Sequence, residues 1–176
     1  MDDDRSRLER KLSPSATRLT LLRAATLLVG WELIQPEVVD KTRDFFSFGF
    51  NPDGPVVSQE YTDRVTSRAP RIFDASVEWL IEAGALTSEQ ADRLKDLRDY
   101  RNLVAHELPR FMVDVEADID LSKLVAMRDV VASLGRFWGQ IEVDTNPDFD
   151  GRDVDPAAIV SGPMALFEFA LELSIE

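Results

Sequence analysis

The residues with the clearest capacity for chemistry stand together at positions 101–106. The string reads Arg-Asn-Leu-Val-Ala-His, and His106 is the single histidine of the 176-residue chain. An imidazole with an ordinary pKa of about 6.5 can accept or donate a proton near neutral pH. Arginine adds a fixed charge and a planar fork of donors that suits phosphate. The segment therefore offers acid–base chemistry beside a phosphate-binding cation.

A helix predicted over residues 87–108 positions these side chains. Thr87 can cap it, with Gln90 as the capping-box partner, and Pro109 disfavours helix at the residue before it. One apolar stripe runs along this helix, made by Leu94, Leu97, Val104, Ala105 and Leu108. Arg101 lies within the stripe, where an unpaired charge would be costly. We therefore expect an acidic partner, a subunit interface or a ligand at Arg101.

Three polar side chains follow the edge of the same stripe. Arg98, Asn102 and His106 are spaced four residues apart, which stacks them on one face of a helix. Arg98 is a candidate substrate-binding residue, and the alternative for it is a solvated helix arginine. The alternative for His106 is a surface or helix-capping histidine.

The segment resembles the signature of HEPN domains (higher eukaryotes and prokaryotes nucleotide-binding). That signature is an arginine and, a few residues later, a histidine, often with a polar residue directly after the arginine. Asn102 fits this preference, and the flanking Leu97-Arg98-Asp99-Tyr100 and Glu107 also resemble HEPN sequences. Outside the motif and its flanks, the resemblance depends only on a helical pattern.

The resemblance implies a compact helical bundle that forms a homodimer. In active HEPN proteins two motifs meet across a cleft and cleave RNA without a metal. Here Arg101 and His106 would be catalytic with help from Asn102, and the products would carry 2′,3′-cyclic phosphate ends. Such a protein would be the toxin of a toxin–antitoxin pair or part of an antiphage system.

Two other interpretations stay open at this point. One is a catalytically inactive HEPN-like module that binds a protein partner, such as an antitoxin, or a nucleotide. The other is a helical interaction protein in which the motif is a coincidence.

The composition limits the classes of function. The chain has no cysteine, so a zinc site would depend on carboxylates and one histidine, and we expect no metal and no cofactor. A net charge of −13 opposes loose binding to phosphate backbones, so an RNA site has to be local and arginine-lined. The N-terminus is charged, and the longest apolar run, residues 24–31, is far shorter than the ~20 residues of a membrane span. These features predict a soluble, cytoplasmic protein with no membrane contact.

The whole pattern predicts a mainly α fold, a HEPN-like helical bundle in one domain over residues 1–176. Residues 1–12 are expected to be a flexible N-terminal segment. Helical spacing covers four further stretches, with a kink or break at Pro70: residues 13–35, 38–46, 58–84 and 121–141.

The remaining segments are predicted from turn residues and alternation. Glycine and proline predict a loop over residues 49–55. Apolar and polar residues alternate over residues 110–118 and 165–175, which predicts a small antiparallel β element. The tail has a helical alternative, in which Phe167, Ala170 and Leu171 face the core.

Overall fold

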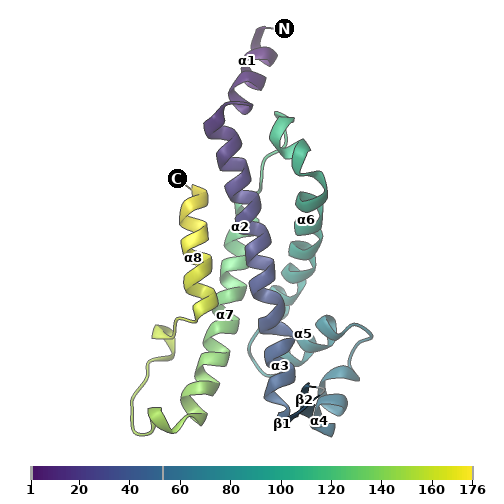
Figure 1. Ribbon diagram of the computed structural model, residues 1–176, viewed down its shortest axis with the longest axis vertical. Helices are drawn as coiled ribbons and strands as arrows, with labels where there is room; N and C mark the ends of the chain where they lie inside the picture. Colours follow the sequence, from purple (N-terminus) through teal and green to yellow (C-terminus); the bar gives the residue numbers. More distant parts are fainter. Residues whose placement is uncertain (1, 53, 176) are drawn as a thin grey trace.

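Helix α2 (Pro14–Val38) runs through the centre of the molecule and contacts the other long helices (Figure 1). These are α6 (Ser88–Val113), α7 (Leu121–Thr145) and α8 (Gly162–Ile175). Helices α2 and α7 run in one direction, and α6 and α8 run in the other. This computed structural model describes residues 2–52 and 54–175. The mainly α fold predicted from the sequence is confirmed.

The shorter elements lie mostly at one end of this bundle (Figure 1). Helix α1 precedes α2 at the opposite end, and a loop with two short 3-10 turns joins α7 to α8. These elements are α1 (Asp2–Lys11), α3 (Asp40–Phe45), β1 (Ser47–Asn51), β2 (Gly54–Val57), α4 (Gln59–Tyr61), the π-helical turn η1 (Thr62–Thr66), α5 (Ile72–Glu82), η2 (Pro147–Phe149) and η3 (Pro156–Ala158).

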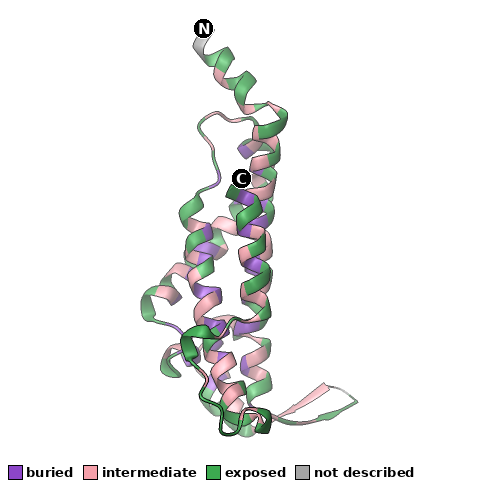
Figure 2. Cartoon of the chain, turned by 90° about the vertical axis from the view of Figure 1, so that its left-hand side faces the viewer, coloured by how far each residue is buried: buried purple, intermediate pink, exposed green. Residues whose placement is uncertain are grey.

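The apolar core lies between the inward faces of the long helices, where buried residues line up in Figure 2. Leu27, Leu94, Leu134 and Phe167 are fully or almost fully buried, one from each of α2, α6, α7 and α8. Gly30 permits the close approach of α8, because a Cβ there would lie 2.5 Å from the Phe167 ring. The α2–α8 contact therefore depends on this glycine.

Helix α6 begins at the predicted place. The Thr87 hydroxyl accepts from the backbone N–H of Gln90, and the Gln90 side chain accepts from that of Thr87, so the capping box is complete. Gly84, with φ of +79°, follows the end of α5 in a conformation that suits glycine. Between η1 and α5 the chain is not helical, so Pro70 marks a break between two helices.

The predicted end of this helix and the strand over residues 110–118 are wrong. Helix α6 continues through Val113 after a kink at Glu107, whose φ of −111° and ψ of 20° are not helical. The kink puts Pro109 into the first turn of the helical stretch that follows it, where a missing N–H is tolerated. The segment after α6 has no strand partner among the described residues. Its acidic side chains pair with basic residues of α1 instead, Glu116 with Arg7 and Asp118 with Lys11.

The expected flexible segment and the predicted tail strand both form helices. Residues 2–11 form α1, and residues 162–175 form α8, so the strand predicted over 165–175 is wrong and its helical alternative is confirmed. Phe167 and Leu171 face the core, one turn apart. Leu166, Phe169, Leu173 and Ile175 are exposed.

The small antiparallel sheet lies in the segment that was predicted as a loop. Strands β1 and β2 pair with Asn51 opposite Gly54. Gly54 adopts a φ of +122°, which explains a glycine at this turn. The hairpin projects from the end of the bundle in Figure 2 and exposes Phe48 and Phe50. Among the described residues, no helix has both the length and the apolar character needed to cross a membrane.

Asp120 gives the α6–α7 junction a predictable pH dependence. Its carboxylate caps α7 by accepting from the backbone N–H of Ser122, and its own N–H donates to the Tyr100 hydroxyl at 2.7 Å. Hydrogen bonds from Ser122 lower the pKa of Asp120 below the ordinary 3.8, because they stabilise the ionised form. The stability from this carboxylate is therefore complete above 3.8 and lost as the pH falls through the lower folded pKa.

Comparing the wild type with Asp120→Asn tests this dependence, because asparagine also caps helices but does not titrate. The wild type should lose its advantage in free energy of unfolding as urea denaturation is repeated from about pH 7 down to about pH 2. A difference that stays constant over this range would show that Asp120 does not supply the acid sensitivity.

Candidate functional site

The four candidate residues lie on α6, around the point where α5 stops covering it. Helix α5 packs beside the first part of α6, and Asp74 in its first turn lies 3.6 Å from Arg98. Beyond Arg98 the same face of α6 continues to Asn102 and His106, which are both exposed. The candidate site is therefore an open face of one helix next to the edge of a second helix.

Arg101 has an acidic partner, one of the three possibilities that its place in the apolar stripe left open. Its Nη2 donates to Oε1 of Glu32 on α2 at 2.8 Å, and its Nη1 donates to Oδ1 of Asn102 at 3.2 Å. The Nε of Arg101 is buried and has no hydrogen-bond partner among the described residues. These contacts fix the guanidinium at the junction of α2 and α6 and leave one donor unsatisfied.

His106 is not brought into contact with Arg101 or Asn102. Its side chain is exposed and makes no hydrogen bond or ion pair with the described residues. It stands just before the kink at Glu107, and Glu107 itself pairs with Arg110 at 2.9 Å. Within one chain, the imidazole is thus free to meet a ligand or a second copy.

Glu32 and Asp74 are the residues that sequence reasoning missed. They lie on α2 and α5, far from the motif in sequence, and each pairs with an arginine that was a candidate. The only local signal for Glu32 was the charge of Arg101 inside an apolar stripe, which left an acidic partner, a subunit interface and a ligand as possibilities. No signal pointed to Asp74.

The ion pair between Arg101 and Glu32 predicts that removing the Glu32 carboxylate strengthens anion binding at Arg101. Side-chain exposures of 29% and 63% keep its contribution to stability small, about 0–1 kcal/mol. Glu32 also competes with any anion for Arg101. Glu32→Gln should therefore raise affinity for a phosphate-containing ligand about two- to fivefold.

Fluorescence anisotropy with a short labelled RNA would measure this change. Glu60→Gln, an exposed site on α4, is the control. Equal affinities of Glu32→Gln and the wild type would show that Arg101 does not contact the RNA.

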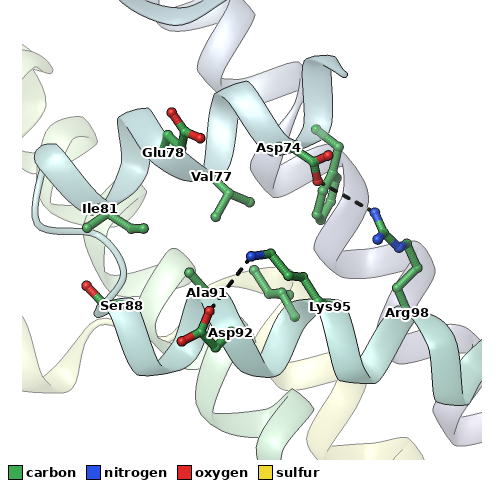
Figure 3. Close-up of a pocket in the computed structure, with 11 residues that line it drawn as sticks. Asp74, Val77, Glu78, Ile81, Ser88, Ala91, Asp92, Lys95 and Arg98 are labelled. Atoms are coloured by element: carbon green, nitrogen blue, oxygen red, sulfur yellow. Dashed lines mark ion pairs between the residues drawn. The ribbon is translucent and has the colours of Figure 1, made fainter. Parts of the chain in front are cut away.

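A cavity opens between α5 and α6, next to Arg98 (Figure 3). Its volume is about 150 Å³. Its apolar walls come from both helices: Phe73, Val77, Ile81, Ala91 and Leu94. Its polar rim consists of Asp74, Glu78, Ser88, Asp92, Lys95 and Arg98. No sequence pattern indicated this cavity, because it depends on how two helices pack.

Comparisons with known proteins add no relative. The chain matches no protein-family model, and neither the curated proteins nor the solved structures yield a significant match. Among the described residues, no group of three or more histidine and acidic side chains is placed to hold a metal ion.

Proposed function

We propose that this protein is a HEPN-like endoribonuclease that acts as a homodimer and needs no metal ion. The observation that carries the proposal is the arrangement on α6. Arg101 is held by Glu32 and Asn102, while the single imidazole of the chain is exposed little more than one turn further along the helix. The arginine, the polar residue directly after it and the histidine four residues further also resemble the HEPN signature.

The proposed reaction is an internal transfer within the RNA strand. One imidazole takes the proton of a ribose 2′-hydroxyl, and the 2′-oxygen attacks the adjacent phosphorus. The bond to the 5′-oxygen of the next nucleotide breaks, and that oxygen receives a proton from a second imidazole. The products are a 2′,3′-cyclic phosphate and a 5′-hydroxyl. Arg101 stabilises the additional negative charge on the phosphate, and Asn102 orients one of its oxygens.

The dimer follows from the number of proton-transfer groups. The reaction needs a base and an acid on opposite sides of the phosphate, and each chain has one histidine. A two-fold axis near the exposed face of α6 would bring two copies of His106 together. The net charge of −13 limits the substrate to a local target, such as an RNA loop, because repulsion opposes long backbones.

A second candidate is a HEPN-like module without catalysis. The Glu32 carboxylate favours it, because this carboxylate occupies the guanidinium that would have to bind the phosphate. Such a module would bind a protein partner or a nucleotide. An antitoxin would be one such partner, and a basic surface on it would complement the acidic chain.

The two candidates differ in a cleavage assay. Purified protein is incubated with structured RNA and EDTA. The new 3′ ends are then tested in an enzymatic tailing reaction, which needs a free 3′-hydroxyl. Ends that carry a 2′,3′-cyclic phosphate resist tailing until the phosphate is removed. The endoribonuclease should produce such ends, and His106→Ala should not. If the wild type and this variant are equally inert, the module without catalysis is favoured. If they are equally active, the cleavage comes from another protein.

A further inference from the structure

The cavity between α5 and α6 has the size of one six-membered ring. Its volume of about 150 Å³ is that of an engineered apolar cavity that binds benzene, roughly 150 Å³. Val77 and Leu94 are buried in its walls, and Ala91 leaves space where a larger side chain would fill it. A fused two-ring system is larger than this space, so the volume favours a single flat ring.

The rim of the cavity holds charged side chains whose ion pairs with one another are long. Asp74 and Arg98 lie 3.6 Å apart, and Asp92 and Lys95 lie 3.8 Å apart, both beyond hydrogen-bond distance (Figure 3). Neither these four side chains nor Glu78 makes a hydrogen bond with the described residues. By contrast, Arg93 on the same helix donates to Glu89 at 2.6 Å. The rim thus has paired carboxylates and cationic groups whose hydrogen-bonding capacity is not used by the described residues.

The cavity and the candidate site share one face of α6. At about 100° per residue, Asn102 and His106 lie about 40° and about 80° around the helix from Arg98. Lys95 lies about 60° around in the same sense. Along the axis, Arg98 and His106 are about 12 Å apart. A short strand could therefore place one base in the cavity and a phosphate near His106.

We propose that this cavity binds the single-ring base of a pyrimidine nucleotide, with Lys95 and Arg98 on its phosphate. The apolar walls enclose the ring, and the rim carboxylates accept from the base N–H groups, as acidic side chains do from the amino group of cytosine. The proposal rests on the proposed function, because it assigns to the RNA substrate a preference for a pyrimidine close to the cleaved bond.

Calorimetric titration with cytidine 5′-monophosphate and adenosine 5′-monophosphate tests the proposal without catalysis. The wild type should bind the adenosine nucleotide at least about tenfold more weakly than the cytidine nucleotide. Ala91→Leu, which fills the cavity, should weaken binding of the cytidine nucleotide by about tenfold or more. Lys95→Ala, at an exposed position, should weaken it about fivefold, while Arg93→Ala serves as the unchanged control.

The outcomes separate this inference from the proposed function. Three outcomes would overturn the pyrimidine site. The two nucleotides bind equally, neither binds, or Lys95→Ala and Ala91→Leu both fold and neither weakens binding of the cytidine nucleotide. If the cytidine nucleotide binds as expected and no RNA is cleaved, the site stands and the nuclease fails. If RNA is cleaved with no pyrimidine preference and no nucleotide binds, the nuclease stands and the site fails.

Discussion

If the proposed function is right, RNA cleavage by the His106→Ala variant should fall by at least about 10²–10⁴-fold, the usual contribution of one acid–base side chain. The loss is large because each chain has a single histidine, so in the proposed dimer the substitution would remove both proton-transfer groups at once. Since the side chain is exposed and makes no polar contact with the described residues, the free energy of unfolding should change by less than about 0.5 kcal/mol. Initial rates on a fluorescent RNA in EDTA, with urea unfolding of the same samples, measure both quantities.

Mixed dimers make the role of the second subunit measurable. Wild type and His106→Ala are unfolded together and refolded at different ratios. If each cleavage event uses one imidazole from each chain, activity falls with the square of the wild-type fraction. If each chain works alone, activity falls in proportion to that fraction. The matched control is Asp96→Ala, an exposed residue about 15 Å from His106 along the axis of α6, which should follow the wild type at every ratio.

The start of the helix that carries the site was predictable, because its signals are local. Thr87 and Gln90 are three residues apart, and the side chain of each accepts a hydrogen bond from the backbone N–H of the other. Asp120 likewise caps α7 within two residues. Arg101 in an apolar stripe predicted that an acidic partner, a subunit interface or a ligand meets it, since an unpaired charge is costly to bury. That the partner is Glu32 depends on how α2 packs, which no local pattern encodes.

The errors occurred where one pattern allows two structures. Proline at position 109 predicts the end of a helix, but a kink at Glu107 converts that proline into a first-turn residue. A loop was predicted over residues 49–55 from their glycines and prolines, yet residues 49–51 and 54–55 belong to the two strands of a hairpin. The alternation over residues 110–118 lacks a partner strand, because the tail that was expected to pair with it forms α8.

Phe167→Ala should lower the free energy of unfolding by about 3–5 kcal/mol, a large part of the 5–15 kcal/mol typical of a domain. The ring is fully buried. A Cβ placed on Gly30 would lie 2.5 Å from the edge of this ring and 2.8 Å from the Met127 sulfur, so the ring packs tightly against α2 and α7. Removing the ring leaves a cavity between α2, α7 and α8 that these helices can close only in part. Urea unfolding followed by circular dichroism measures the loss.

Phe169→Ala is the control, and it also tests the conformation of the tail. In a strand, residues 167 and 169 would share one face and both substitutions would be costly. In helix α8 they lie about 160° apart, so Phe169 is 59% exposed and its replacement should change stability by less than about 0.5 kcal/mol. Similar losses in the two variants would contradict the helix. A large loss in Phe167→Ala alone would show that the apolar alternation of this tail encodes one buried and one exposed helix face.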